Sequence, residues 1–306
     1  MTRYLDHQKD LVTKLIDMIE SNKGEKTWQM PWVGHESLLF ATNAVTKNAY
    51  RGSNTINLAI EGIDRKFTTG EWATFNQWKS VNAQVQGGQK ASYIVKWIKP
   101  EFKDGQDDRE DRFKGSLIPR VYAVFNADQV SGYTPETLEL PTPSDPIQAV
   151  EDWLDAVGAE GSEGNRACYS PATDKITMPH FEKFKSAEGF YATALHEHMH
   201  WTGHKSRLDR DQTGAMNTDG YALEELVAEL GSAIACSKLG LVSEPREDHA
   251  LYLEHWLNEL KANPKVLFSA ARDAQKAFDY LDDAAKGMLK KINTPTDARY
   301  QEPAVA

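Results

Sequence analysis

The chain has 306 residues, of which 40% are hydrophobic, 26% charged and 10% aromatic, and its formal net charge is −10. This composition supplies enough apolar residues for a buried core and excludes a disordered, collagen-like or coiled-coil protein. At about 150 residues per domain, the length suggests two domains. No run approaches the roughly 18 apolar residues that a membrane span needs, so we expect no membrane association.

The cysteines and the N-terminal residues indicate the cellular compartment. Cys168 and Cys236 lie far apart in the sequence, which argues against a disulfide scaffold or a thiolate zinc finger and favours a reducing compartment. The N-terminal residues show no basic segment followed by an apolar stretch, so we expect no secretory signal. These features predict a cytoplasmic protein.

Charge is distributed unevenly. Residues 1–135 carry 18 basic and 16 acidic side chains, whereas residues 136–306 carry 17 and 29. Within the first half, residues 47–99 hold eight basic and three acidic side chains. The asymmetry is typical of a chain whose first half meets a polyanion such as nucleic acid. An ordinary solvated surface is the alternative, because many nucleic-acid-binding surfaces are more basic than this.

The first half, residues 1–133, is predicted to be a mixed α+β domain. Apolar residues recur at helical spacing in its first segment, and β-branched and aromatic residues dominate two later ones. We expect helices at residues 5–21, 54–62 and 74–83, and strands at residues 38–42, 91–98 and 118–125. Residues 103–114 are nearly all charged, which predicts a mobile loop.

Prolines mark a boundary between the halves. Residues 134–148 contain four prolines and are predicted to be a linker. A second, mostly helical domain is expected at residues 149–292, followed by a flexible tail at residues 293–306. Its expected elements are a strand segment at residues 167–178, broken near 171–174, and helices at residues 146–157, 181–201, 220–239, 248–260 and 264–289. Gly203 and Gly240 follow two of these helices, where a left-handed residue is favoured.

The clearest chemical signal is an H-E-x-x-H motif near the end of one predicted helix. His196 and His200 are four residues apart, which places both imidazoles on one helix face, where they can bind the same Zn²⁺. Glu197 is placed to act as general base on a water molecule that the metal activates. The pattern predicts a zinc metallopeptidase, although the same string also arises by chance in helices.

The third ligand distinguishes the classes of zinc peptidase. The metzincin class requires a histidine at position 206, where this chain has Ser206. The gluzincin class takes a glutamate from a second helix, which predicts Glu225 as third ligand and Glu229, four residues later, as an acid that orients a ligand histidine. An acidic face on a solvated helix is the alternative for these glutamates. His204 is a weaker alternative ligand.

Several motifs together resemble ArdC-type antirestriction proteins over about residues 5–290. In the first half they are W-x-x-P-W at 28–32, Y-R-G-x-N at 50–54, W-x-T-F-x-Q at 72–77 and G-G-Q-K at 87–90. In the second half they are H-E-x-x-H-W-T-G-H at 196–204 and Y-A-x-E-E-L-V-A-E-L at 221–230.

The resemblance implies a single-stranded-DNA-binding domain followed by a mostly helical, zincin-like domain with a small sheet, in a protein of mobile elements that protects incoming DNA from host restriction. The first half is also similar to that of a plasmid primase. Interleaved rings and lysines are typical of proteins that stack unpaired bases without selecting a sequence. On both grounds we predict nine DNA contacts: Trp32, Tyr50, Arg51, Asn54, Trp72, Phe75, Gln77, Lys90 and Lys96. The alternative is that most of the tryptophans form a core.

Three functions remain open from the sequence. In the first, the chain coats single-stranded DNA entering a cell, and its zinc site is structural or secondary. In the second, DNA binding delivers a zinc peptidase to DNA-bound proteins, which it cleaves. In the third, the acidic second half mimics DNA and blocks restriction enzymes directly; only its charge favours this reading.

Overall fold

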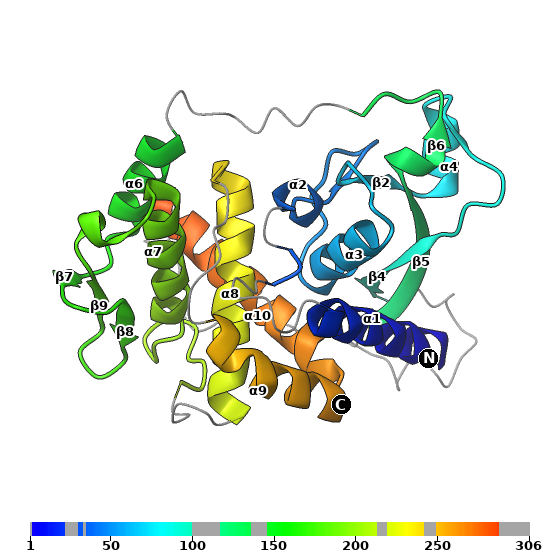
Figure 1. Cartoon of the computed structure of the whole chain (residues 1–306). Helices are drawn as coiled ribbons and strands as arrows, with labels where there is room; N and C mark the ends of the chain where they lie inside the picture. Colours follow the sequence, from blue (N-terminus) through cyan, green and yellow to red (C-terminus); the bar gives the residue numbers. More distant parts are fainter. Residues whose placement is uncertain are drawn as a thin grey trace, which may run out of the picture.

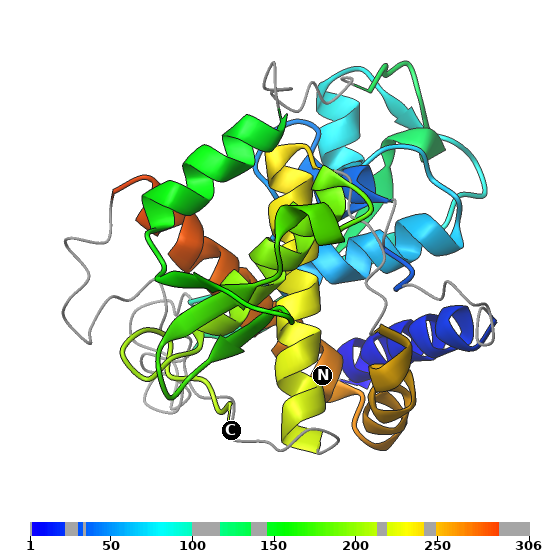
Figure 2. The ribbon, with the colours of Figure 1, turned by 60° about the vertical axis from the view of Figure 1, so that its left-hand side comes forward.

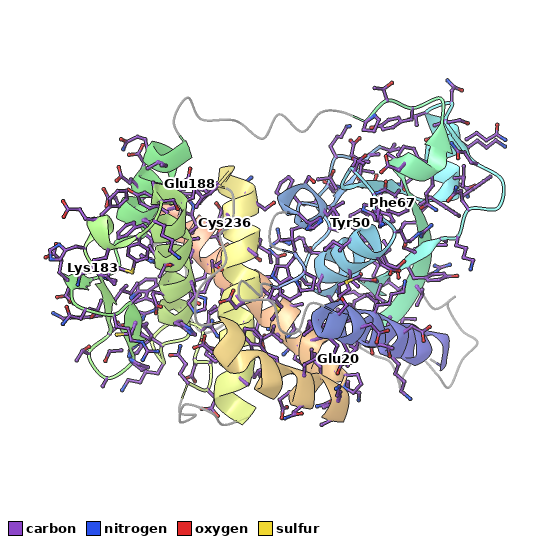
Figure 3. The ribbon with its side chains drawn as sticks, viewed as in Figure 1. Glu20, Tyr50, Phe67, Lys183, Glu188 and Cys236 are labelled. Atoms are coloured by element: carbon purple, nitrogen blue, oxygen red, sulfur yellow. The ribbon has the colours of Figure 1, made fainter. Side chains whose placement is uncertain are left out.

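A computed structural model describes residues 2–21, 30–32, 35–99, 117–135, 146–212, 219–241 and 249–287 (Figure 1). The loop predicted at 103–114, the tail predicted at 293–306 and most of the predicted linker lie outside the described residues. None of the described helices is long and apolar enough to cross a membrane. Both cysteines are free thiols, Cys168 exposed and Cys236 buried on helix α8 (Figure 3).

The first half combines helices with a four-stranded sheet. The sheet has the order β1-β2-β5-β4, with β1 parallel to β2 and the other pairs antiparallel, and β3 pairs with β6 in a separate ribbon. The elements are α1 (Thr2–Ser21), α2 (Glu36–Leu39), β1 (Thr42–Asn43), α3 (Ser53–Asp64), β2 (Glu71–Ala73), α4 (Phe75–Ser80), β3 (Gln84–Val85), β4 (Ser92–Ile98), β5 (Ile118–Asn126), η1 (Ala127–Gln129) and β6 (Val130–Ser131).

The second half is mostly helical, with a three-stranded sheet of order β7-β9-β8 packed on α7 (Figure 2). Strand β9 is central, parallel to β7 and antiparallel to β8. The elements are α6 (Pro146–Val157), β7 (Gly161–Glu163), β8 (Cys168–Ser170), β9 (Lys175–Met178), η2 (Phe181–Lys183), α7 (Ala187–Thr202), α8 (Asp219–Leu239), α9 (His249–Ala262) and α10 (Lys265–Ala285). The α+β architecture expected from the sequence is therefore present.

Two predicted elements of the first half need correction. The strand predicted at 38–42 is wrong, because residues 36–39 form α2 and only Thr42 of that segment is in a strand. The helix predicted from residue 74 begins one residue later and ends at Ser80. Thr74 is its N-cap: the Thr74 hydroxyl accepts from the backbone N–H of Gln77, and the Gln77 side chain accepts from the Thr74 N–H.

The helix predicted at 181–201 is shorter at its start. Residues 181–183 form a single 3₁₀ turn, and α7 begins at Ala187 because the Ser186 hydroxyl caps it, accepting from the Gly189 N–H at 3.0 Å. Gly240 has the expected left-handed φ of 72°, but Gly203 has a φ of −75°, so that expectation was wrong. A Cβ at Gly203 would lie 2.5 Å from Gln212 Nε2, so close approach explains this glycine.

One hydrophobic core contains residues from both halves. Leu15 of α1 and Ile60 of α3 belong to the same buried cluster as Leu230 of α8, Trp256 of α9 and Leu267 of α10. Polar contacts bridge the halves as well. Glu20 forms an ion pair with Lys261 at 2.5 Å, Arg51 forms one with Asp279, and the Gly52 N–H donates to Gln275 Oε1 at 3.1 Å. The division into domains at 134–148 stays a prediction, and the two halves stabilise each other.

We expect Leu15→Ala to destabilise the whole chain. Leu15 is fully buried in the shared cluster, so its truncation leaves a cavity that costs about 2–5 kcal/mol in the free energy of unfolding. Urea denaturation followed by circular dichroism measures this as a lower midpoint of one transition. Thr13→Ala, at an exposed position of α1, is the control and should leave the midpoint nearly unchanged. Two separate transitions, only one of them shifted, would contradict the shared core.

Candidate metal centre and nucleic-acid interface

Helices α7 and α8 pack side by side and place the histidine motif in the interior (Figures 1 and 2). The two helices approach closely at Gly231 of α8, where a Cβ would lie 2.7 Å from Met199 Sδ of α7. His196 is 1% and Glu197 is 3% exposed, and Glu225 of α8 is 5% exposed. Packing thus turns the motif of one helix towards the glutamates of the other.

Three of the predicted site residues converge on one point. His196 Nε2 and His200 Nε2 are 3.0 Å apart, and the Glu225 carboxylate lies across from both, with Oε2 3.5 Å from His196 Nε2 and Oε1 3.4 Å from His200 Nε2. One ligand atom from each of the three lies within 4.8 Å of the others. Two imidazole nitrogens and one carboxylate oxygen, supplied by two helices, form a donor set that fits a divalent transition metal ion.

Each of these histidines has a carboxylate of its own on the second ring nitrogen. Glu229 Oε1 lies 3.2 Å from His196 Nδ1, and Glu224 Oε1 lies 3.1 Å from His200 Nδ1. A carboxylate at Nδ1 fixes the tautomer and directs Nε2 towards the metal. Glu229 therefore lies beside His196, where an orienting acid was predicted, and Glu224 has the equivalent position beside His200. The orienting role stays a prediction.

Glu224 is held by a loop that the sequence analysis did not single out. Arg210 donates to Glu224 through Nε at 2.9 Å and Nη2 at 2.8 Å, and Gln212 Nε2 donates to it at 3.1 Å. Arg210 Nη2 also donates to the Met199 carbonyl at 2.7 Å, which ties the loop to α7. Adjacency to Glu225 could have drawn attention to Glu224, but no spacing rule predicts Arg210 or Gln212.

The electrostatics of the centre favour a positive charge. Burial lowers the pKa of His200, but the charge of Glu225 and the hydrogen bonds that the imidazole donates to Glu224 and Glu225 outweigh it and raise that pKa to about 10. Burial likewise raises the pKa of Glu225, and the two neighbouring imidazoles more than reverse this and hold it far below its usual range. A divalent cation between these groups would supply the positive charge that the buried carboxylates require.

Two other histidines lie outside this cluster. His198 points to another face of α7, and its Nδ1 is 2.7 Å from the Ala194 carbonyl oxygen. Burial lowers the pKa of His198, which favours a neutral, structural side chain. His204, the weaker alternative ligand, contacts Ser206 at 2.7 Å instead.

Comparison with known proteins assigns the chain to a family. Residues 6–125 match the family model of the N-terminal domain of anti-restriction factor ArdC, and residues 148–273 match that of a zincin-like metallopeptidase. The Mn(II)-bound crystal structure of the antirestriction protein ArdC from plasmid R388 is 35% identical, with a TM-score of 0.72 over 91% of this chain and 97% of that one. The chain belongs to the ArdC family of antirestriction proteins.

Two curated relatives extend this ArdC assignment. The uncharacterized protein y4eC of Sinorhizobium fredii is 35% identical over 90% of this chain and 91% of its own length. The DNA primase TraC of Escherichia coli is 36% identical over 88% of this chain, but the match spans only 19% of the primase. The family resemblance and the two-part architecture expected from the sequence are confirmed.

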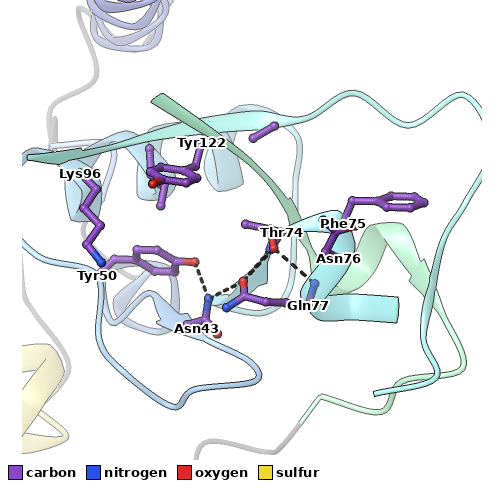
Figure 4. Close-up of a pocket in the computed structure, with 10 residues that line it drawn as sticks. Asn43, Tyr50, Thr74, Phe75, Asn76, Gln77, Lys96 and Tyr122 are labelled. Atoms are coloured by element: carbon purple, nitrogen blue, oxygen red, sulfur yellow. Dashed lines mark hydrogen bonds between the residues drawn. The ribbon is translucent and has the colours of Figure 1, made fainter. Parts of the chain in front are cut away.

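Four of the nine predicted DNA contacts of this ArdC-family chain meet at one cavity of about 600 Å³ (Figure 4). The four are Tyr50, Phe75, Gln77 and Lys96. Strand β4, helix α4 and the segment before α3 bring them together. Phe75 is 54% exposed, so its ring is available at the rim.

Trp32 and Trp72 are corrected from DNA contacts to core residues. Trp32 is 1% and Trp72 is 0% exposed. Trp32 packs in the cluster shared between the halves, and Trp72 packs beside Leu58 and Val124. Stacking on a base requires an open ring face, which neither side chain has in this structure.

The three remaining predicted contacts are not part of the cavity lining. Arg51 pairs with Asp279 of α10. The Asn54 amide pairs with the backbone of Val95 on the edge strand β4, its Nδ2 donating to the carbonyl at 2.8 Å and its Oδ1 accepting from the N–H at 2.9 Å. The lysine at position 90 has an exposed side chain before β4. Asn54 therefore serves the fold, since an edge strand presents unpaired backbone groups.

Glu229→Gln is expected to weaken metal binding by about 10–100-fold, because the variant lacks the carboxylate beside His196 Nδ1. Competition with a chromogenic chelator measures the Kd of the full chain for Zn²⁺. Glu182→Gln, at an exposed position before α7, is the matched control and should bind as the unchanged chain does. An unchanged Kd for Glu229→Gln would contradict the orienting role.

Proposed function

We propose that this ArdC-family chain binds single-stranded DNA with its first half, without sequence selection, and protects incoming mobile-element DNA from restriction in the cytoplasm of the host. A zinc metallopeptidase centre in the second half accompanies this activity. The observation that carries the proposal is the convergence of His196, His200 and Glu225 in a chain whose first half matches the ArdC N-terminal domain.

Zinc fits the residues at the proposed centre. Two imidazoles and a carboxylate leave a fourth position open, which is the donor set of catalytic zinc sites. A bound Zn²⁺ would polarise a peptide carbonyl and make water a better nucleophile. The relative from plasmid R388 is described as Mn(II)-bound, so a metal analysis of this chain must compare both ions.

Glu197 is the proposed general base. Its carboxylate is buried beside the ligand histidine His196 and would accept a proton from the attacking water and deliver it to the leaving amine. Strand β8 is an edge strand of the small sheet and contacts α7. An extended peptide could pair with the edge of β8 that no described strand occupies. These features support a second function for the same chain, DNA-dependent cleavage of proteins bound to DNA, restriction enzymes among them.

Burial of the acidic side chains at the candidate metal site weakens the third hypothesis, in which the acidic half mimics DNA. Glu224, Glu225 and Glu229 contribute to the charge of that half, yet each is at most 6% exposed. A mimic needs its carboxylates on the surface, where a partner can meet them. We therefore rank mimicry below the other two hypotheses.

We expect Glu197→Gln to abolish cleavage of a protein preloaded on single-stranded DNA, because an amide cannot accept the proton. Gel electrophoresis of that protein, with and without the DNA, measures the activity. Metal content and DNA affinity of the variant should match those of the unchanged chain, and Glu188→Gln on the same helix is the control. Full protection of transferred DNA by Glu197→Gln would show that protection does not depend on proteolysis.

Binding of the full chain to single-stranded DNA should weaken as salt rises. Each phosphate that a lysine or arginine neutralises adds about 0.7 to the slope of log Kd against log salt concentration. Fluorescence anisotropy with a labelled oligothymidylate measures this slope, and a duplex of equal length serves as competitor. Binding that is absent, or insensitive to salt, would overturn the DNA-binding proposal.

A further inference from the structure

The cavity beside α4 has a fixed floor of hydrogen-bonded side chains (Figure 4). Asn43 Nδ2 donates to Tyr50 Oη at 3.0 Å and to Gln77 Oε1 at 3.1 Å. Thr74 donates to the same Gln77 oxygen through its N–H and its hydroxyl, each at 3.0 Å. Tyr50 Oη donates in turn to the Trp72 carbonyl at 3.4 Å. Since these bonds hold Tyr50 and Gln77 in place, the cavity is pre-formed.

Two tyrosine rings line the cavity from different elements. Figure 4 shows the ring of Tyr122, from β5, on one side and the ring of Tyr50 across from it, whereas Phe75 points away from both. Burial raises the pKa of Tyr50, so its ring stays a neutral phenol. A volume of about 600 Å³ lies within the range of about 300–1,000 Å³ that small-molecule sites occupy. Such a space suits a flat, uncharged ring.

A hydrogen-bond donor and one cation line this cavity, and a second cation lies beside the first. The Gln77 carboxamide uses its oxygen within the floor, and among the described residues its Nε2 has no acceptor. Lys96 lines the cavity, and its direct cross-strand neighbour on β5 is Arg120. Like charges that face each other across two strands destabilise a sheet. No carboxylate among the described residues pairs with either side chain, so an anion bound there would relieve the repulsion.

We propose that the cavity receives one unstacked base of bound DNA between the rings of Tyr50 and Tyr122, with the adjoining phosphate on Lys96 and Arg120. Gln77 Nε2 donates to an acceptor on the base edge; every base carries one, so the pocket accepts any sequence. The inference rests on the proposed DNA-binding function and adds two residues, Tyr122 and Arg120, that are not among the nine predicted contacts.

The opposite face of β4 and β5 is the alternative surface for DNA binding. Tyr93 and Trp97 of β4 and Val121 of β5 lie on that face and are about 40% exposed: 41%, 40% and 40% respectively. Side chains alternate between the two faces along a strand, so Tyr93 and Ile94 of the cavity point in opposite directions. Tyr93 is therefore a matched control for Tyr122, being an exposed tyrosine on the paired strand but on the opposite face.

The test uses the full chain and an oligothymidylate of about 12 nucleotides carrying one 2-aminopurine. Tyr122→Leu should raise the Kd about tenfold or more and reduce the change in 2-aminopurine fluorescence on binding, because the base loses a stacking partner. Tyr122→Phe keeps the ring and should bind within about twofold of the unchanged chain. Lys96→Gln should lower the salt slope by about 0.7, whereas Lys9→Gln on α1 should not.

Thermal melting of each variant checks that it is folded. Unchanged binding by folded Tyr122→Leu would overturn the cavity inference while leaving the DNA-binding proposal in place. Loss of binding in Tyr93→Leu to the same extent would also overturn it and assign DNA to the opposite face. No binding by the unchanged chain would remove the proposed function, and the inference with it.

Discussion

The packing of α7 against α8 is the contact on which the candidate metal centre depends. It brings two imidazoles and three carboxylates into a space from which water is largely excluded, and buried charges are costly unless they are paired. Each carboxylate here faces an imidazole, and Glu224 has Arg210 as well. The close approach at Gly231 makes this geometry possible. The sheet β7-β9-β8 and helix α10 then support the helix pair from different sides.

The sequence predicted the residues of the centre wherever a periodicity connects them. His196 and His200 share a face because they are four residues apart, and the same spacing relates Glu225 to Glu229. The sequence did not reveal Arg210 and Gln212, because their contact with Glu224 depends on the path of the loop after α7. The observed helix starts differ from the predicted ones where a capping side chain sets the start, as Thr74 does for α4 and Ser186 for α7.

Aromatic residues of the first half were harder to interpret. A tryptophan that stacks on a base and one that fills a core look alike in sequence, and only burial separated Trp32 and Trp72 from Phe75. Strand β2 was not predicted from the sequence, because it is buried throughout and too short to show an alternating pattern of apolar and polar residues. Tyr50, Gln77 and Lys96 stay predicted DNA contacts, and the structure shows that three separate segments bring them to one cavity.

The core shared by both halves has a consequence for how the gene can recombine. Helix α10 contacts α3 of the first half as well as α7 and α8, so neither matched family segment can be exchanged by recombination without exposing an apolar face on the other. Gene fusions should therefore carry the unit whole. The match to TraC has that form, since 88% of this chain recurs within a much longer primase.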